Sequence, residues 1–158
     1  MGIWAAKFLP FCVDYLPGFP VSHIGFSISY ARHFFDVPNV SFNMLLPSLI
    51  APGGKSFLRD AKEKHNRQVY AWTVNEQDKM EWCIRKQLDG VITDDPKKFL
   101  EVCKRFDEKS KAPWLPVSFR GYLEVLRVWL WVRIAILLFF GKRLEPKASQ
   151  KLIRRAAK

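Results

Sequence analysis

Short apolar runs alternate with longer polar, helix-like stretches along the first two thirds of the chain. Continuous apolar runs of this length are typical of strands buried on both faces. They predict four strands, at Val21–Ser29, Val40–Leu46, Val69–Val74 and Gly90–Thr93. Apolar spacing and helix-starting residues predict helical segments at Ile3–Leu16, Tyr30–Phe35, Lys55–Asn66, Asn75–Leu88 and Asp95–Phe106, with a loop at Pro47–Gly54.

This alternation indicates an α/β fold with a parallel sheet. An open flavodoxin-like sheet and a segment of a TIM-type (β/α)8 barrel both fit it. A closed barrel typically needs ~250 residues, and this chain has 158. The chain therefore divides into a partial α/β domain at 1–106, a polar linker at 107–118, an apolar helix at 119–141 and a basic tail at 142–158.

The apolar helix contains Glu124, Arg127 and Arg133, so it is not an uninterrupted apolar span of ~20 residues. Its aromatic and flanking basic residues are typical of a membrane interface. We expect it to lie in one leaflet; a spanning anchor and a helix packed on the protein are the alternatives. The expected membrane contacts are Trp129, Trp131, Phe139 and Phe140.

The net charge is +11, and the tail after Gly141 carries seven Lys or Arg residues and one Glu. A basic segment beside an apolar helix favours an anionic membrane surface as partner. No nucleic-acid-binding motif is present, so no nucleic acid is expected. The cysteines Cys12, Cys83 and Cys103 lack metal-ligand spacing and indicate an intracellular protein. We expect it to be membrane-associated, with a lipid droplet or endomembrane as plausible locations.

The runs Trp72-Thr73-Val74-Asn75 and Gly90-Val91-Ile92-Thr93-Asp94-Asp95-Pro96 resemble the last two strands of the glycerophosphodiester phosphodiesterase family. Weaker matches at Ile24–Ser27 and Ser41–Met44 extend the resemblance over about 1–106, and it is most similar to the fungal phosphatidylglycerol phospholipase C type. The resemblance implies the C-terminal half of a TIM-type barrel, about four parallel strands. The substrate would be a phospholipid or glycerophosphodiester.

In such barrels the active site lies at the carboxyl ends of the strands. The residues at those ends are Ser27, Asn43, Trp72, Asn75 and Asp94, and they are the candidate substrate-binding residues. Trp72 is the strongest of them, as an apolar wall for a glycerol or acyl-glycerol group. Asn75 and Asp94 also fit helix caps, and Asp95 fits one best.

The resemblance implies a His-Arg-Gly strand, a second catalytic histidine and carboxylates that hold Mg²⁺ or Ca²⁺ in a complete member. None of these motifs occurs here, and His23, His33 and His65 lack the required neighbours. No catalytic or metal-binding residue is therefore assigned. We expect an incomplete phosphodiesterase, inactive alone; the alternative is a non-catalytic membrane-bound pseudoenzyme that binds anionic lipid. Open barrel edges would also favour self-association.

Overall fold

The computed structural model describes residues 1–107 and 116–140. One parallel sheet has the strand order β1-β2-β3-β4-β5, with bounds Gly2–Ile3, Val21–Gly25, Val40–Leu45, Val69–Trp72 and Gly90–Val91. Each strand pairs with the one before it in the chain, whereas a flavodoxin-like sheet has the order 2-1-3-4-5. The α/β fold is therefore that of a partial TIM-type barrel, and the flavodoxin-like alternative was wrong.

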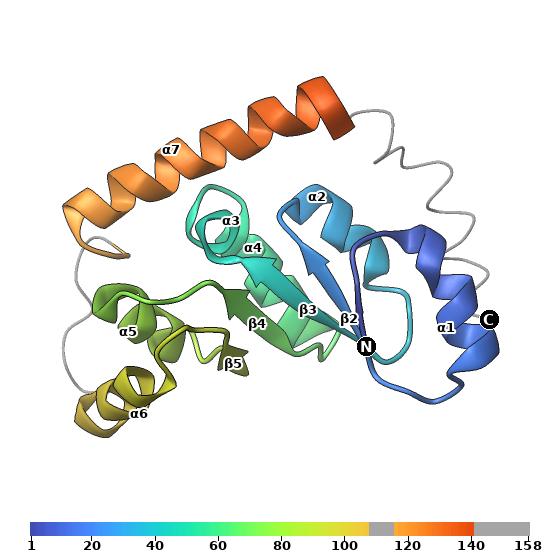
Figure 1. Ribbon diagram of the computed structural model, residues 1–158, viewed down its shortest axis with the longest axis horizontal. Helices are drawn as coiled ribbons and strands as arrows, with labels where there is room; N and C mark the ends of the chain where they lie inside the picture. The colour runs from blue at the N-terminus through green and yellow to red at the C-terminus, as the bar shows by residue number, and fades with distance from the viewer. Residues whose placement is uncertain (108–115, 141–158) are drawn as a thin grey trace.

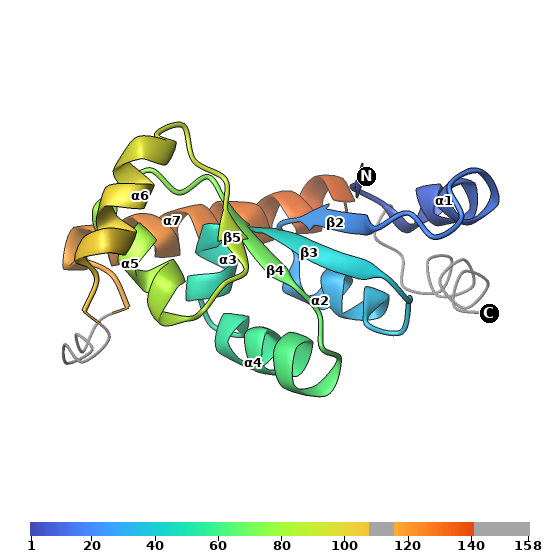
Figure 2. The ribbon, with the colours of Figure 1, turned by 90° about the horizontal axis from the view of Figure 1, so that it is seen from below.

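Helices connect the strands, and among the described residues two further α-helices follow the last strand in the chain (Figure 1). The α-helices are α1 Leu9–Tyr15, α2 Ile28–Ala31, α3 Leu46–Ile50, α4 Gly54–Arg59, α5 Gln77–Arg85, α6 Pro96–Arg105 and α7 Phe119–Ala135. Short 3-10 turns are η1 Ala6–Phe8 and η2 Arg32–Phe34, and π-helical turns are η3 Asp60–Lys64 and η4 Ile136–Phe140. Helices α2 and α4 lie on the same side of the sheet (Figure 2).

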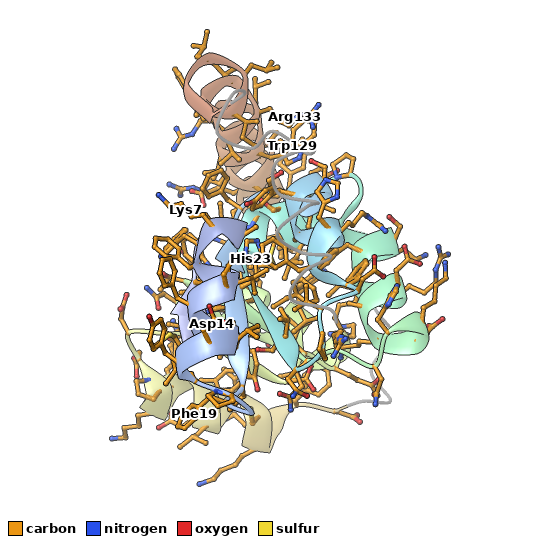
Figure 3. The ribbon with its side chains drawn as sticks, turned by 90° about the vertical axis from the view of Figure 1, so that its right-hand side faces the viewer. Lys7, Asp14, Phe19, His23, Trp129 and Arg133 are labelled. Carbon is orange, nitrogen blue, oxygen red and sulfur yellow. The ribbon has the colours of Figure 1, made fainter. Side chains whose placement is uncertain are left out.

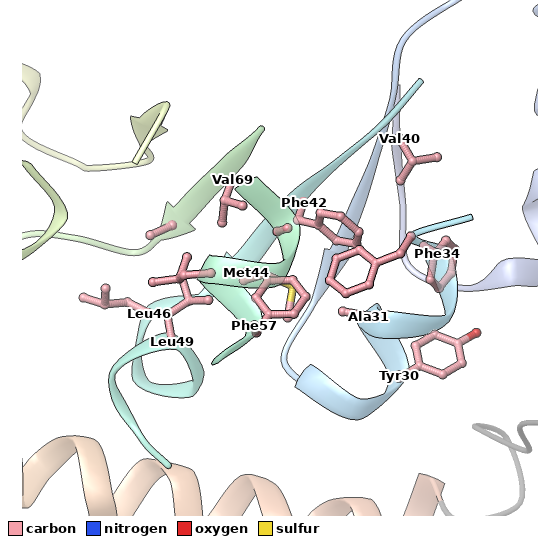
Figure 4. Packing of buried hydrophobic residues seen from close by; sticks show 14 of the residues in the cluster. Tyr30, Ala31, Phe34, Val40, Phe42, Met44, Leu46, Leu49, Phe57 and Val69 are labelled. Carbon is pink, nitrogen blue, oxygen red and sulfur yellow. The ribbon is translucent and has the colours of Figure 1, made fainter. Parts of the chain in front are cut away.

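Burial alternates along each of the three central strands, so one face of the sheet carries the core. Phe42 and Met44 of β3 are fully buried, whereas Asn43 between them is only partly buried. The buried face packs against helical residues such as Phe34 and Phe57 (Figure 4). The opposite face, which would line a barrel, stays partly open. The continuous apolar runs had predicted burial on both faces, and the structure shows burial on one.

The N-terminal prediction was wrong in part, because a fifth strand precedes the first helix. Gly2 and Ile3 pair in parallel with Ser22 and His23 of β2. A Cβ at Gly2 would lie 2.6 Å from Ile24 Cδ1, so a larger residue there would require the Ile24 side chain to move. The helix expected from Ile3 begins only at Leu9, with Pro10 in its first turn, where proline needs no amide partner.

Other boundaries also moved. The loop expected at Pro47–Gly54 contains α3, which starts with Pro47 in its first turn. The last strand ends at Val91, although the Ile92 amide still donates to the Ala71 carbonyl over 2.8 Å. The helix expected over Lys55–Asn66 turns from α to π geometry at Asp60. Glu76, and not Asn75, occupies the cap of α5, because the Asn75 side chain has other partners.

Helix α7 is fixed to the domain at its N-terminal end. The Ser118 amide donates to Asp78 Oδ2 over 2.9 Å, and Lys79 Nζ lies 3.7 Å from Glu124 Oε2. Burial of Asp78 opposes its ionisation, but the hydrogen bonds from Ser118 hold the pKa of this carboxyl below its usual value. Gly121 is buried against the same carboxylate. From there α7 runs past α3 and α2, at the end of the sheet to which the strand arrows point (Figure 1).

Within the two described ranges, no helix combines the length and the apolar character that crossing a bilayer requires.

His23, in the middle of β2, is a core residue. It is 1% exposed and stacks on Phe34 with 4.2 Å between ring centroids. Neither of its ring nitrogens has a hydrogen-bond partner among the described residues. Burial lowers the pKa of His23 to about 4, and the backbone of Ile3 only partly opposes this. The ring is therefore neutral in the folded chain at physiological pH, in a structural position.

This burial predicts a pH-dependent stability. Between about pH 6.5 and about pH 4 the unfolded chain protonates His23 and the folded chain does not. The free energy of unfolding should therefore fall by about 3 kcal/mol across that window as the pH decreases. Urea unfolding of the full chain at both ends of the window measures it. His23→Phe should remove this part of the slope, and an unchanged slope in that variant would contradict the assignment.

Candidate functional site

Two aromatic side chains and one amide meet at the carboxyl end of the sheet, on its open face. Trp72 ends β4 and pairs in register with Leu45 of β3. Its indole Nε1 donates to the Asn43 carbonyl oxygen over 3.0 Å. Trp4, directly after β1, packs against Trp72 in a T-shaped arrangement, with ring centroids 5.9 Å apart and planes at 71°. These three residues form the indole shelf, an apolar surface with a polar rim.

The Asn43 side chain leaves one polar atom of the indole shelf without a partner. Its Oδ1 atom is buried and has no hydrogen-bond partner among the described residues. A buried amide oxygen without a partner costs about 1–3 kcal/mol of free energy. A ligand hydroxyl would recover that cost only after a movement of the shelf that exposes the oxygen.

A second polar group joins the ends of β4 and β5. Asn75 Nδ2 donates to Asp94 Oδ2 over 2.6 Å, and Asn75 Oδ1 accepts from Thr93 Oγ1 and from the Asp94 amide, each over 3.0 Å. Lys98 Nζ donates to the Asn75 carbonyl over 2.7 Å. Asn75 is thus a bridge between two loops. Neither Asn75 nor Asp94 caps a helix, whereas Asp95 does cap α6, by accepting from the Lys98 amide.

Ser27 lies apart from both groups. Its hydroxyl accepts from the Tyr30 amide over 3.3 Å and so caps α2; it also contacts Ser29 Oγ at 3.1 Å. The structure therefore brings Asn43 together with Trp72, and Asn75 together with Asp94. Ser27 is separate from both pairs and lines a cavity beneath α7.

The four expected membrane contacts differ in position. Trp131 on α7 is 66% exposed. Trp129 is half-buried and lines the cavity beneath the helix, so it faces the domain. The side chains of Phe139 and Phe140 lie outside the described residues. The outer face of α7 and of the η4 turn that follows it nevertheless exposes large apolar side chains, each by more than half: Phe119, Leu123, Leu130, Leu137 and Leu138. The charged Arg120, Glu124 and Arg127 are also exposed on α7.

Two site residues were missed by sequence reasoning. Trp4 was assigned to a helix face, because a strand of two residues leaves no periodic signal. Lys98 was read only as part of a helix start. The available signal for Lys98 was its position in the first turn after Asp95-Pro96, which directs the side chain toward the strand ends.

The remaining histidines offer no acid–base pair. His65 stacks on Phe35 with centroids 4.4 Å apart, and His33 contacts the Tyr30 ring edge at 6.3 Å. Over residues 1–107 and 116–140, no three His, Cys, Asp or Glu side chains are grouped as metal ligands. The divalent cation that the resemblance implies thus has no donor set in this part of the chain.

Comparison with known proteins gives one match. The model of the Glycerophosphoryl diester phosphodiesterase family matches residues 11–98, which is more than half of the chain. The matched range contains β2 to β5 and all five candidate substrate-binding residues. Neither the curated proteins nor the solved structures yielded a match.

The Asn75 bridge predicts a measurable contribution to stability. Asn75→Ala leaves Thr93 Oγ1 and the Asp94 amide without their acceptor, so the free energy of unfolding should fall by about 1–2 kcal/mol. Gln77→Ala is the matched control, because the Gln77 side chain donates to the exposed Glu81 one helical turn away; we expect a change below about 0.5 kcal/mol. Chemical denaturation of both variants tests this, and equal effects would argue against the bridge.

Proposed function

Since the chain belongs to the Glycerophosphoryl diester phosphodiesterase family, we propose that it is a phospholipid-directed member of the phosphatidylglycerol phospholipase C type. In this proposal the chain supplies a substrate wall and a membrane-binding helix. It does not supply the acid–base pair. The substrate class is a glycerophospholipid or its deacylated glycerophosphodiester.

The position of α7 carries the proposal. This helix passes the carboxyl ends of β2 and β3, where Phe26, Ser27 and Ser48 line one cavity with Trp129 and Arg133. Its outer face exposes Leu123, Leu130 and Trp131 together with the charged Arg120, Glu124 and Arg127. A helical face that combines apolar and charged side chains is stable when it lies at the headgroup–acyl boundary. Such attachment would bring the barrel mouth close to the bilayer surface, from which a lipid substrate could enter.

The indole shelf supports the substrate class. The rings of Trp4 and Trp72 suit the apolar part of a glycerol or acyl-glycerol group, and a movement of the shelf that exposes the unpartnered Asn43 Oδ1 would supply an acceptor for its hydroxyl. The bridge of Asn75 and Asp94 defines the adjacent rim. In this arrangement Trp72, Asn43, Asn75 and Asp94 are substrate-binding residues, and Ser27 contributes from the neighbouring cavity.

The charge of the chain favours anionic membranes. The formal net charge is +11, and the basic residues of the tail are Lys142, Arg143, Lys147, Lys151, Arg154, Arg155 and Lys158. The tail lies outside the described residues, so this step rests on sequence alone. Each basic residue near an anionic leaflet contributes about 1 kcal/mol or less, and the apolar face of α7 supplies the rest. The proposed location is an intracellular membrane, such as an endomembrane or lipid droplet.

Membrane attachment is testable on the exposed face of α7. Replacing Trp131, Leu137 and Leu138 together by Ser should abolish binding of the full chain to neutral phosphatidylcholine vesicles, since these side chains are 66%, 76% and 70% exposed and make up the apolar contact. Sedimentation with vesicles measures it. The control replaces Phe11 and Tyr15 of α1, which are also exposed, by Ser. Binding that survives the α7 change, or is lost equally in the control, would count against the proposal.

Catalysis gives a separate prediction. No histidine of this sequence has the family's catalytic neighbours, and each general acid or base contributes ~10²–10⁴-fold to rate. The 158-residue chain should therefore release no diacylglycerol from phosphatidylglycerol, and no glycerol phosphate from glycerophosphodiesters, with Mg²⁺ or Ca²⁺ added. Turnover that EDTA removes would show that the chain is catalytic as it stands. The alternative, a pseudoenzyme that binds anionic lipid, makes the same prediction for the isolated chain. The two hypotheses differ in that an incomplete phosphodiesterase would regain turnover when the missing catalytic half is supplied, whereas a pseudoenzyme would not.

A further inference from the structure

A cavity of about 230 Å³ lies between α7, α2 and the turn from α3 to α4. It is lined by serine hydroxyls, by the backbone of that turn and by two arginines, Arg32 and Arg133. The cavity is smaller than the ~300–1,000 Å³ of sites that enclose a drug-sized ligand. Its size therefore suits a headgroup-sized ligand better than an entire lipid.

The cavity has a positive lining. Arg32 and Arg133 contribute, and no Asp or Glu lines it. The Arg133 guanidinium carbon lies 5.8 Å from the Trp129 ring centroid; both residues are labelled in Figure 3. Arg133 forms no ion pair with any described residue. An arginine held against an aromatic ring keeps its charge and its planar set of donors available for an oxyanion.

Two hydrogen bonds to neighbouring side chains hold the Arg32 guanidinium in place. Its Nη1 donates to Asp60 Oδ2 over 2.6 Å, and its Nη2 donates to Ser56 Oγ over 3.1 Å. Asp60 also contacts Lys64 at 2.9 Å and Arg59 at 3.5 Å. The Arg32 guanidinium and the Lys64 ammonium hold the pKa of this carboxyl far below its usual range. Three cations thus share one carboxylate, so Asp60 orients Arg32 without cancelling the local positive charge.

Hydroxyl groups complete the donor set. Ser27 and Ser29 share one hydrogen bond of 3.1 Å, and both residues line the cavity. A hydroxyl can donate one hydrogen bond and accept two, so the pair retains capacity for a further bond. Ser56 lies between Arg32 and the turn, and its hydroxyl donates to the Gly53 carbonyl. Two guanidinium groups with several hydroxyls, and no lining carboxylate, form a chemical environment that favours a phosphate group over a carboxamide or a sugar hydroxyl.

The depth of the cavity matches a bilayer headgroup. A helix with its side chains is about 10–12 Å across, and an interfacial helix buries its apolar face by about 5–10 Å. The cavity lies on the side of α7 that faces the domain, and the exposed Leu130 is not among the residues that line it. With α7 in the interface, the cavity would therefore be level with the phosphates of the same leaflet.

We propose that this cavity, between Arg32, Arg133 and the serines of α2 and α4, is a binding site for a phosphate group carried by a lipid headgroup. The proposal rests on the membrane attachment proposed above. The site is separate from the indole shelf and would hold an anionic lipid beside the barrel mouth. Free phosphate shares the same chemistry and is distinguished by the experiment.

The test compares two arginines of the same helix in the full chain. Arg133→Gln removes a cavity residue, whereas Arg127→Gln removes the same charge from an exposed position of α7 outside the lining. On vesicles of phosphatidylcholine with phosphatidylglycerol, a diffuse charge effect weakens binding by no more than about fivefold in either variant. Loss of a direct phosphate contact should weaken Arg133→Gln by about tenfold more. Equal affinities of the two variants would overturn a lipid site.

A second variant tests the cavity without a charge change. Ser29→Phe fills the space between α2 and α7, and it should reproduce the loss of Arg133→Gln while binding neutral vesicles like the parent. Circular dichroism checks that both variants fold. If Ser29→Phe folds and binds phosphatidylglycerol vesicles as tightly as the parent, the headgroup does not enter the cavity.

Sodium phosphate, compared with sodium chloride at equal ionic strength, is the free-ligand arm. A rise in Tm of the parent that Arg133→Gln loses, together with equal vesicle affinities of the two arginine variants, would assign the site to free phosphate and reject the lipid headgroup. Failure of both arms would overturn the site altogether. Failure of membrane attachment alone is recognised separately, because the parent would then bind no neutral vesicles.

Discussion

An aromatic triad holds the sheet to its helices, and the rest of the fold depends on it. Phe42 of the central strand β3 contacts Phe35 and Phe57 at 5.3 Å each, and these two stack at 5.4 Å. Because side chains alternate along a strand, this contact commits every second residue of β3 to the covered face. Asn43 and Leu45 must then lie on the other face. The buried triad thus determines which residues face the barrel interior.

The alternating pattern of apolar runs was sufficient to predict the α/β class and the positions of β2 to β5. It could not predict β1, because Gly2 and Ile3 form a strand only through pairing with Ser22 and His23, far along the chain. Local propensity also misjudged α3, where Pro47 starts a helix and does not end one. The choice between a barrel segment and an open sheet depended on strand order, which periodicity does not encode.

In the candidate site, too, some features could be predicted from the sequence and others depend on contacts between distant residues. Strand ends could be predicted from the sequence, so Asn43, Trp72, Asn75 and Asp94 were named as candidates there, and their role in substrate binding stays a prediction. Their partners could not be read. Asn75 forgoes the cap of α5 because three hydrogen bonds to Thr93 and Asp94 are available to its amide. Trp129 was assigned to the membrane on composition, yet the helix rotation set by Gly121 and Asp78 turns it toward the domain.

Helix α7 combines a packed inner face with a mixed outer face. On the inner face Val125 is 1% exposed; on the outer face Leu130 is 54% exposed and lies among the exposed charged residues Arg120 and Arg127. Exposed apolar side chains next to basic ones are the composition of helices that lie in an interface. The docking contacts lie near the first turns of the helix, at Ser118 and Glu124, whereas the cavity lies beneath its second half. The contacts that fix the helix to the domain are therefore separate from the residues that enclose the cavity.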